Sequence, residues 1–323
     1  AGCSGDNVSP DFVRVWGTGE PDLIDGNHLN ARFDNPVNVE VAANGSVYVA
    51  DFYNEAIRVI GTDNQVSTLV VQPNFSRPFG LTRFGETLYV QTDANDLGQR
   101  DSTTGTIWSV DRFTGDATVV ARNLGRPRGI VALSDGRIVL SDLVMNTISI
   151  LDPGTGNVTP LAGRPGEAGF VNGNGTDALF SRAYGVAIMN DGSILVADQN
   201  NNAIRRVTLT GQVSTFAGTG VAGSLNGPVA TATFNHPGDV SVVGSTVYVA
   251  DHDNHVIRKI VGGVVSTVAG NGSAGFVDSE SNLLDEFFGM EGIAVTADGS
   301  SLWIADGSNG EPEPYNRVRR IRL

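Results

Sequence analysis

One short motif recurs along this chain of 323 residues, and it constrains the fold more than any other feature. In its strongest form the motif is an apolar run that ends in Ala-Asp, and in weaker forms it ends in Ser-Asp or Gln-Thr. Six copies stand at residues 47–51, 88–92, 138–142, 194–198, 247–251 and 302–306. Self-similarity of this kind indicates an array of repeated supersecondary units.

Other strand-like runs surround each copy of the motif. A second run follows after a short turn, as in residues 56–60 and 256–260, and a third follows in residues 66–70 and 265–269. Before each copy stands an inner run introduced by a Pro- or Gly-containing turn, as at residues 36–39. Four strands per unit, repeated six times, predict an all-β chain folded as a six-bladed β-propeller.

The two ends of the sequence are predicted to form one unit. The sixth unit stops one strand short at the C-terminus, whereas residues 12–17 form a strand-like run that leads into Gly-Thr-Gly, as other outer strands do. We therefore expect residues 12–17 to complete the blade that contains residues 302–305, which removes exposed sheet edges. The predicted domains are an N-terminal tail, residues 1–11, and a single propeller, residues 12–323.

The repeated residues resemble those of NHL repeats over nearly the whole chain. The resemblance rests on Ala-Gly-x-Gly at 217–220 and 269–272, and on Ala-x-Phe at 31–33, 178–180 and 232–234. It also rests on Val-Ala-Asp followed by Asn-x-x-Ile-Arg. The resemblance implies a six-bladed propeller of four-stranded blades, in which each inner strand begins at the mouth of a central channel.

Some repeated residues are interpreted as structural. Aspartates recur at the end of the motif, where aspartate side chains bond backbone N–H groups of turns; they are Asp51, Asp142, Asp198, Asp251 and Asp306. Arginines recur in the following strand, and we expect them to tie neighbouring blades together; they are Arg58, Arg205, Arg258 and Arg319.

Residues that depart from the repeat say more about function, because repeated positions serve the scaffold. At the start of the inner strands the variable positions carry aromatic, charged and amide side chains. The candidate ligand-binding residues are Asn38, Phe79, Arg128, Tyr184, Asp239 and Glu291. This set suits a small polar ligand or a peptide side chain. The alternative is a water-filled funnel in which Arg128 neutralises Asp239 or Glu291.

Two loops, residues 92–106 and 307–316, are longer than their counterparts and enlarge the same face. Long loops on a rigid scaffold often carry binding residues. The first loop also suggests a structural calcium site, although its spacing does not match the EF-hand pattern; the residues are Asp93, Asn95, Asp96 and Asp101. No other cofactor is expected.

Enzymes with similar propellers provide an alternative function. Amidating lyases resemble this fold and hold zinc with histidines at the start of inner strands, but here only His236 stands near such a position. Lactonases resemble it too and surround calcium with Glu, Asn and Asp, but Arg128 replaces an expected amide. These differences favour a non-catalytic binding or scaffold module. A metal-dependent lyase or hydrolase and an architectural subunit of a homomeric or envelope assembly remain the alternatives.

Charge and the first residues bear on partners and location. The net charge of −14 argues against nucleic acid, whose phosphates bind Lys and Arg. The start Ala1-Gly2-Cys3-Ser4 resembles a bacterial lipoprotein signal, which makes Cys3 a candidate for lipidation and membrane anchoring. The alternatives are secretion with cleavage before Ala1 and an incidental free cysteine. We expect an extracytoplasmic protein, in the bacterial periplasm, on the cell surface or secreted, with a protein or peptide partner.

Overall fold

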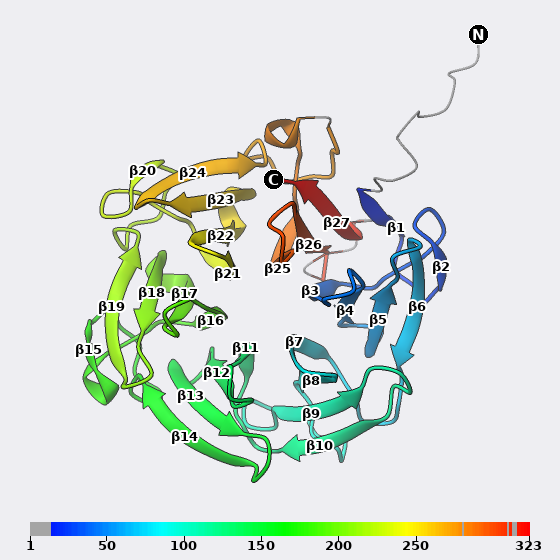
Figure 1. The fold of residues 1–323 in the computed structure, drawn as a ribbon, viewed down its shortest axis with the longest axis horizontal. Helices are drawn as coiled ribbons and strands as arrows, with labels where there is room; N and C mark the ends of the chain where they lie inside the picture. The colour runs from blue at the N-terminus through cyan, green and yellow to red at the C-terminus, as the bar shows by residue number, and fades with distance from the viewer. Residues whose placement is uncertain (1–13, 280, 309, 312–314) are drawn as a thin grey trace.

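Six antiparallel sheets stand in a ring around a central axis (Figure 1). The structure is a computed structural model that describes residues 14–279, 281–308, 310–311 and 315–323. The predicted tail, residues 1–11, and the lipidation candidate Cys3 lie outside the described residues. The predicted all-β, six-bladed propeller is confirmed.

The first three blades come from the N-terminal half of the chain. Blade 1 consists of β3 (Pro36–Val41), β4 (Val47–Asp51), β5 (Ala56–Ile60) and β6 (Gln65–Val70). Blade 2 consists of β7 (Pro78–Phe84), β8 (Thr87–Thr92), β9 (Thr106–Asp111) and β10 (Ala117–Ala121). Blade 3 consists of β11 (Pro127–Ala132), β12 (Ile138–Asp142), β13 (Thr147–Asp152) and β14 (Asn157–Ala162).

The remaining blades follow in the same order around the ring. Blade 4 consists of β16 (Ala183–Ile188), β17 (Ile194–Asp198), β18 (Ala203–Val207) and β19 (Gln212–Ala217). Blade 5 consists of β21 (Pro237–Val243), β22 (Thr246–Asp251), β23 (Val256–Val261) and β24 (Val264–Ala269). Blade 6 consists of β25 (Gly289–Val295), β26 (Ser301–Gly307), β27 (Asn316–Arg322) and the N-terminal β1 (Val15–Gly19).

Short elements lie in the connections between blades and strands. Three blades gain a fifth, two-residue strand on their outer edge: β2 (Gly26–Asn27), β15 (Gly173–Asn174) and β20 (Gly227–Pro228). The helical elements are single 3₁₀ turns, η1 (Gly175–Asp177), η2 (Gln199–Asn201), η3 (His252–Asn254) and η4 (Asn282–Leu284). Within the described residues, no helix has the length and apolarity needed to cross a membrane.

The repeated aspartate and arginine form a buried ion pair inside each of four blades. In blade 1, Asp51 accepts a hydrogen bond of 2.9 Å from Arg58, and both side chains are fully buried. Asp51 also accepts one from the backbone N–H of Asp34. The Arg58 guanidinium lies 5.1 Å from the ring centroid of Phe33. Burial raises the pKa of Asp51 to about 6, against the opposing charge of Arg58.

Besides pairing with the aspartate of their own blade, these arginines bind the segment that connects that blade to the preceding one. Arg58 donates to the backbone carbonyls of Arg32 and Ile24, in the segment that leads into blade 1. The same pair recurs in blades 4, 5 and 6, as Asp198–Arg205, Asp251–Arg258 and Asp306–Arg319. The expectation that these residues serve the scaffold is consistent with these contacts.

Blade 2 replaces the ion pair with a neutral one. Thr92 stands at the position of the aspartate, and Trp108 at that of the arginine. The Trp108 indole N–H donates a hydrogen bond of 2.7 Å to the Thr92 hydroxyl, and the indole packs edge-on against Phe75. In the weak copy of the motif at residues 88–92, the hydrogen bond between Trp108 and Thr92 therefore takes the place of the ion pair.

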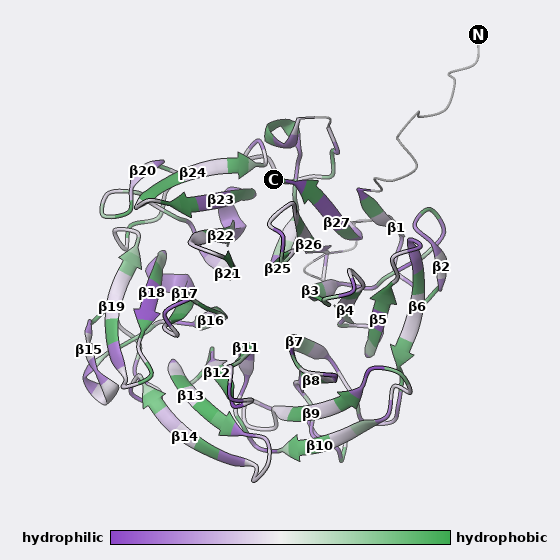
Figure 2. Ribbon diagram, viewed as in Figure 1, coloured by the Kyte–Doolittle hydropathy of each residue, from purple (hydrophilic) through white to green (hydrophobic). Residues whose placement is uncertain are grey.

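The ring closes in blade 6 through the predicted N-terminal strand. β1 pairs antiparallel with β27, with Trp16 opposite Val318. The indole of Trp16 is fully buried and lies 4.5 Å from that of Trp303 on β26. Hydrophobic stretches occur in the strands of every blade (Figure 2), and most of the buried side chains are apolar. Because both chain ends belong to one sheet, the blade has no unpaired edge at the junction.

Candidate ligand site at the channel mouth

A β-bulge at the start of the inner strands sets the geometry of the channel mouth. In blade 1, Pro36 pairs with Asp51 and Asn38 pairs with Ala50, so that Val37 has no partner. The other inner strands show a register shift at the same place. The bulge turns one residue per blade toward the mouth, namely Val37, Phe79, Arg128, Tyr184, Gly238 and Glu291.

Two adjoining pockets lie at this mouth. We call the first, of about 240 Å³, the aromatic pocket; its lining includes Phe52, Tyr53, Phe79, Arg126, Arg128, Arg182, Tyr184 and Glu291. We call the second, of about 370 Å³, the histidine pocket; its lining includes Arg182, Tyr184, Gln199, Asn200, His236, His252, Asp253 and Glu291. The shared walls make one depression whose size suits a small ligand.

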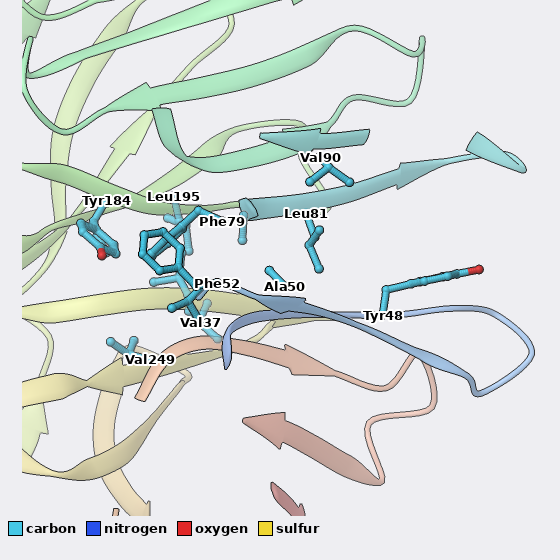
Figure 3. Close-up of a cluster of buried hydrophobic side chains, with 14 of the residues drawn as sticks. Val37, Tyr48, Ala50, Phe52, Phe79, Leu81, Val90, Tyr184, Leu195 and Val249 are labelled. Atoms are coloured by element: carbon cyan, nitrogen blue, oxygen red, sulfur yellow. The ribbon is translucent and has the colours of Figure 1, made fainter. Parts of the chain in front are cut away.

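Three of the predicted residues form a bar across the channel. The rings of Phe79 and Tyr184 pack edge to face with centroids 5.7 Å apart (Figure 3). The Tyr184 hydroxyl donates a hydrogen bond of 3.2 Å to the carboxylate of Glu291. Burial raises the pKa of Glu291, whereas His252 and Arg128 oppose the shift. The bar joins blades 2, 4 and 6.

Arg128 is paired with Asp93, a residue of the long loop in blade 2. The guanidinium Nη2 lies 3.2 Å from Asp93 Oδ2, and its carbon lies 4.2 Å from the Phe79 ring centroid. Arg126 binds the same carboxylate at 2.8 Å. Burial would lower the pKa of Arg128, but the charge of Asp93 outweighs it and raises this pKa. The ion pair of Arg128 is therefore with Asp93, and Arg128 acts on Glu291 through its charge, which opposes the rise of the Glu291 pKa.

Asn38 and Asp239 do not line the mouth pockets. They line a separate channel cavity of about 270 Å³, together with Glu40 and Ser241. Asp239 is buried and accepts a hydrogen bond of 2.9 Å from the backbone N–H of Ile293 in blade 6. Burial raises its pKa to about 7, against that backbone bond. The prediction that all six residues converge on the mouth is corrected for these two, because the bulge directs the next residue down the channel.

The residues of the calcium hypothesis are dispersed and have other partners. Asp93 binds Arg126 and Arg128, and Asp96 binds Arg122 in an exposed ion pair. Asn95 and Asp101 accept hydrogen bonds from the backbone of their own loop. No group of three or more His, Cys, Asp or Glu side chains is placed to hold a metal within the described ranges. The arrangement does not fit a calcium site.

Histidines do reach the mouth, but not at the inner strands. His236 Nδ1 and His252 Nδ1 each lie 2.7 Å from a different oxygen of Asp253. Burial would lower the pKa of His252, but the hydrogen bond that its Nδ1 makes to the Asp253 carboxylate and the charge of Glu291 outweigh burial and raise this pKa. The two rings and the carboxylate form one wall of the histidine pocket, and such a group can exchange protons.

Sequence reasoning named His236 and Asp93 but did not place them in the ligand-binding set, and it missed the other mouth residues that flank the strands. One set precedes the inner strands and includes Arg126, Arg182 and His236. The other follows the second strands and includes Phe52, Asp93 and His252. These positions also vary between blades, so the comparison used for the inner strands would have found them if it had been extended by one residue.

Comparisons with known proteins agree with this fold. No family model matches the chain. The chain is 27% identical over 284 residues to the chloroplastic Protein SUPPRESSOR OF QUENCHING 1 of Arabidopsis thaliana, covering 77% of this chain and 27% of that protein. It is 36% identical over 124 residues to human NHL repeat-containing protein 2, covering 35% of this chain and 17% of that protein. It thus spans about a quarter or less of these relatives.

Solved structures resemble the whole ring. An auxiliary nutrient binding protein from Bacteroides thetaiotaomicron superposes with a TM-score of 0.74 at 18% identity, over 95% of this chain and 75% of that chain. A virginiamycin B lyase from Staphylococcus aureus gives a TM-score of 0.56 at 13% identity, over 90% and 95%. At these identities the likeness concerns the fold.

Fold and mouth together define a six-bladed β-propeller with a ligand-sized depression at one end of its channel. The repeat residues and the similarity to NHL repeat-containing protein 2 specify the family further. The chain is an NHL-type six-bladed propeller.

Proposed function

We propose that this propeller is a binding module that takes a small polar ligand, or one side chain of a peptide, at the channel mouth. The observation that carries the proposal is the gathering of non-repeated side chains around two joined pockets at one end of the channel. Aromatic rings and charged groups in a concave site suit specific recognition. A nutrient binding protein with the same fold supports the proposal as an analogy.

The opposite face offers a useful contrast. Its turns, such as those at residues 44–45, 191–192 and 298–299, are short and contain Asn-Gly or Asp-Gly. Their carboxylates and amides cap the turns, as Asp191 does for Ser193 and Asp298 does for Ser300. These side chains are occupied by local hydrogen bonds, so we expect a ligand to prefer the mouth.

A fragment screen tests the proposal. Wild-type protein is screened against a library of small polar compounds by saturation-transfer NMR, and hits are mapped by hydrogen–deuterium exchange. We expect protection at residues 79–80, 126–129 and 182–185, and none at residues 191–192 or 298–299. Protection confined to the opposite turns, or no hit that protects the mouth, contradicts the proposal.

A second candidate function is acid–base catalysis in the histidine pocket. It is favoured by the His236–Asp253–His252 contacts beside Glu291 and Tyr184. Groups of this kind can move protons when their pKa values are shifted. Mass spectrometry of each mouth-binding hit after prolonged incubation separates the candidates. A recovered, unchanged ligand supports the binding module, whereas conversion that His252→Ala abolishes supports the enzyme.

We further propose that the protein works outside the cytoplasm, where its partner is a protein, a peptide or a small nutrient. The support is the fold shared with auxiliary nutrient binding proteins from Bacteroides thetaiotaomicron and Bacteroides ovatus. Lipid anchoring through Cys3 stays a prediction from the sequence. Fractionation of the producing cells and protease treatment of intact cells test the location; protein found only in the cytosol contradicts it.

A further inference from the structure

The charge of the aromatic pocket runs against that of the whole protein. The chain carries a net charge of −14, yet Arg126, Arg128 and Arg182 line this pocket with Glu291. Asp93 neutralises only one of the two arginines that share it. Three guanidinium groups therefore face two carboxylates, and the pocket keeps a positive excess.

Arg182 is the arginine with a guanidinium left for a ligand. Its side chain is exposed and lines both mouth pockets. In the part of the chain that the structure describes, this guanidinium has no carboxylate within ion-pair distance and no hydrogen-bond acceptor. Its backbone is fixed, because the Arg182 N–H donates a 2.7 Å hydrogen bond to Asn146 Oδ1. The main chain from which the guanidinium extends is thus fixed beside the pocket.

Arg182 has a backbone conformation that arginine adopts less readily than asparagine does. Its φ is 56°, in the left-handed region that asparagine adopts more readily than arginine. Blade 1 has Asn35 at this position, with a φ of 52°. Blades 2, 4 and 5 instead have Arg77, Arg182 and His236. The strained choice places basic side chains at the mouth.

The opposite wall of the pocket is aromatic. The rings of Phe52 and Phe79 pack edge to face with centroids 6.1 Å apart, and Phe52 and Tyr53 do so at 5.1 Å. Figure 3 shows Phe52, Phe79 and Tyr184 side by side at one end of the blades, far from Tyr48 at the other end. Phe52, Phe79 and Tyr184 are buried, whereas the Tyr53 ring beside Phe52 is 40% exposed and lines the pocket. Tyr53 can therefore cover the flat apolar body of a small molecule.

We infer that the aromatic pocket binds a small organic carboxylate with a flat apolar body, whose charged group pairs with Arg182 and whose body packs against the exposed ring of Tyr53, beside the buried rings of Phe52 and Phe79. This inference rests on the proposed binding function and specifies its ligand class. Guanidinium and carboxylate groups match in plane and can form two parallel hydrogen bonds. Inorganic phosphate has no apolar body, so it lacks the contact with the aromatic lining that an organic carboxylate makes.

A matched set of probes tests the ligand class on unmodified protein. The probes are 3-phenylpropionate, its neutral amide, the cation 3-phenylpropylammonium and inorganic phosphate, each titrated by NMR or calorimetry at pH 7.5. The peptide Gly-Gly-Phe with a free or an amidated C-terminus distinguishes a peptide end from a free acid as the source of the carboxylate. We expect 3-phenylpropionate or the free peptide to bind at least about tenfold more tightly than its amide, because a charge-assisted contact is lost.

Two arginine variants of blade 4 localise the contact. Arg182→Gln is expected to reduce the affinity for the carboxylate by about tenfold or more and to leave the amide unaffected. Arg206→Gln is the matched control, because Arg206 lies in the same blade and pairs with Asp191 on the opposite face. It is expected to change neither affinity. Circular dichroism verifies that both variants remain folded.

The outcomes separate this inference from the proposed function. Equal affinity for acid, amide and cation at the mouth, or tighter binding of phosphate, overturns the carboxylate and leaves the binding module standing. An Arg182→Gln affinity equal to that of wild type overturns the assignment to Arg182. Failure of every probe to bind at millimolar concentration overturns the ligand class, and the fragment screen then decides the proposed function independently.

Discussion

The Tyr184 hydroxyl donates a hydrogen bond to the Glu291 carboxylate across the channel, from blade 4 to blade 6. Phe79 packs against the Tyr184 ring, and these three side chains line the pocket at the channel mouth. The channel cavity that contains Asp239 and Glu40 is lined by none of these three side chains. The propeller therefore offers two chemically different spaces: a basic, aromatic mouth and an acidic channel.

The bar across the channel predicts unequal costs for two substitutions. Phe79→Ala removes a buried ring and is expected to reduce the free energy of unfolding by about 3–5 kcal/mol. Tyr184→Phe removes only one hydrogen bond, and the expected loss is about 0.5–1.5 kcal/mol. Urea denaturation measures both. Tyr89→Phe is the control, and a loss as large as that of Tyr184→Phe would argue against a specific contribution of the hydrogen bond.

Two adjacent arginines in blade 4 allow the contribution of the buried ion pair to the free energy of unfolding to be measured. Arg205 is fully buried against Asp198, whereas the Arg206 side chain is 41% exposed against Asp191. Arg205→Gln leaves a buried carboxylate without its charge partner and is expected to cost about 3–5 kcal/mol. Arg206→Gln is expected to cost less than about 1 kcal/mol. Similar losses for both variants in denaturant titrations would show that the repeated pair does not hold the blade.

Ring closure predicts that the N-terminal strand stabilises the whole propeller. Trp16→Ala removes the indole that packs on Trp303, and a loss of about 3–5 kcal/mol is expected. Phe113, which is 73% exposed, provides the control through Phe113→Ala. Calorimetry should show one cooperative transition shifted to lower temperature. An unchanged midpoint for Trp16→Ala contradicts the role of β1 in closing the ring.

The sequence predicts the fold well because each repeat contains the apolar runs that form the strands of its blade. The copies of the motif fix the six blades, and the run at residues 12–17 fixes the closure that β1 confirms. The sequence identifies the copy that ends in Thr92 as one of the six blades despite its missing aspartate. It does not predict the hydrogen bond between Thr92 and Trp108. That contact depends on the strand register, which places Trp108 opposite Val90 and so within reach of the Thr92 hydroxyl.

The site is predicted less completely, and the reason is geometric. Phe79, Arg128, Tyr184 and Glu291 reach the mouth as expected, but Asn38 and Asp239 lie below it. Strand alternation predicts which side of a sheet a residue occupies, but a bulge interrupts that alternation. The pairing of Arg128 with Asp93 depends on a long loop folding back, which no repeat encodes.

The acidic channel gives the last prediction, a dependence of stability on pH. Burial raises the pKa of Asp239 to about 7 and that of Glu40 to about 7, well above the range of an exposed carboxyl group. The native state therefore retains protons that the unfolded state has already released above pH 4. Stability from these groups is present below the unfolded pKa and falls as pH rises from about 4 toward 7. Asp239→Asn removes one of these titrations.

Asparagine is a matched replacement, because Asn38 occupies the corresponding position in blade 1. The difference in unfolding free energy between Asp239→Asn and wild type should move in favour of the variant by about 1 kcal/mol or more per pH unit within this window, and level off above pH 7. Denaturant titrations at pH 5, 6, 7 and 8 measure it. Asp191→Asn, in an exposed turn, is the control. A constant difference between Asp239→Asn and wild type would mean that Asp239 is already ionised at pH 5 in the folded protein.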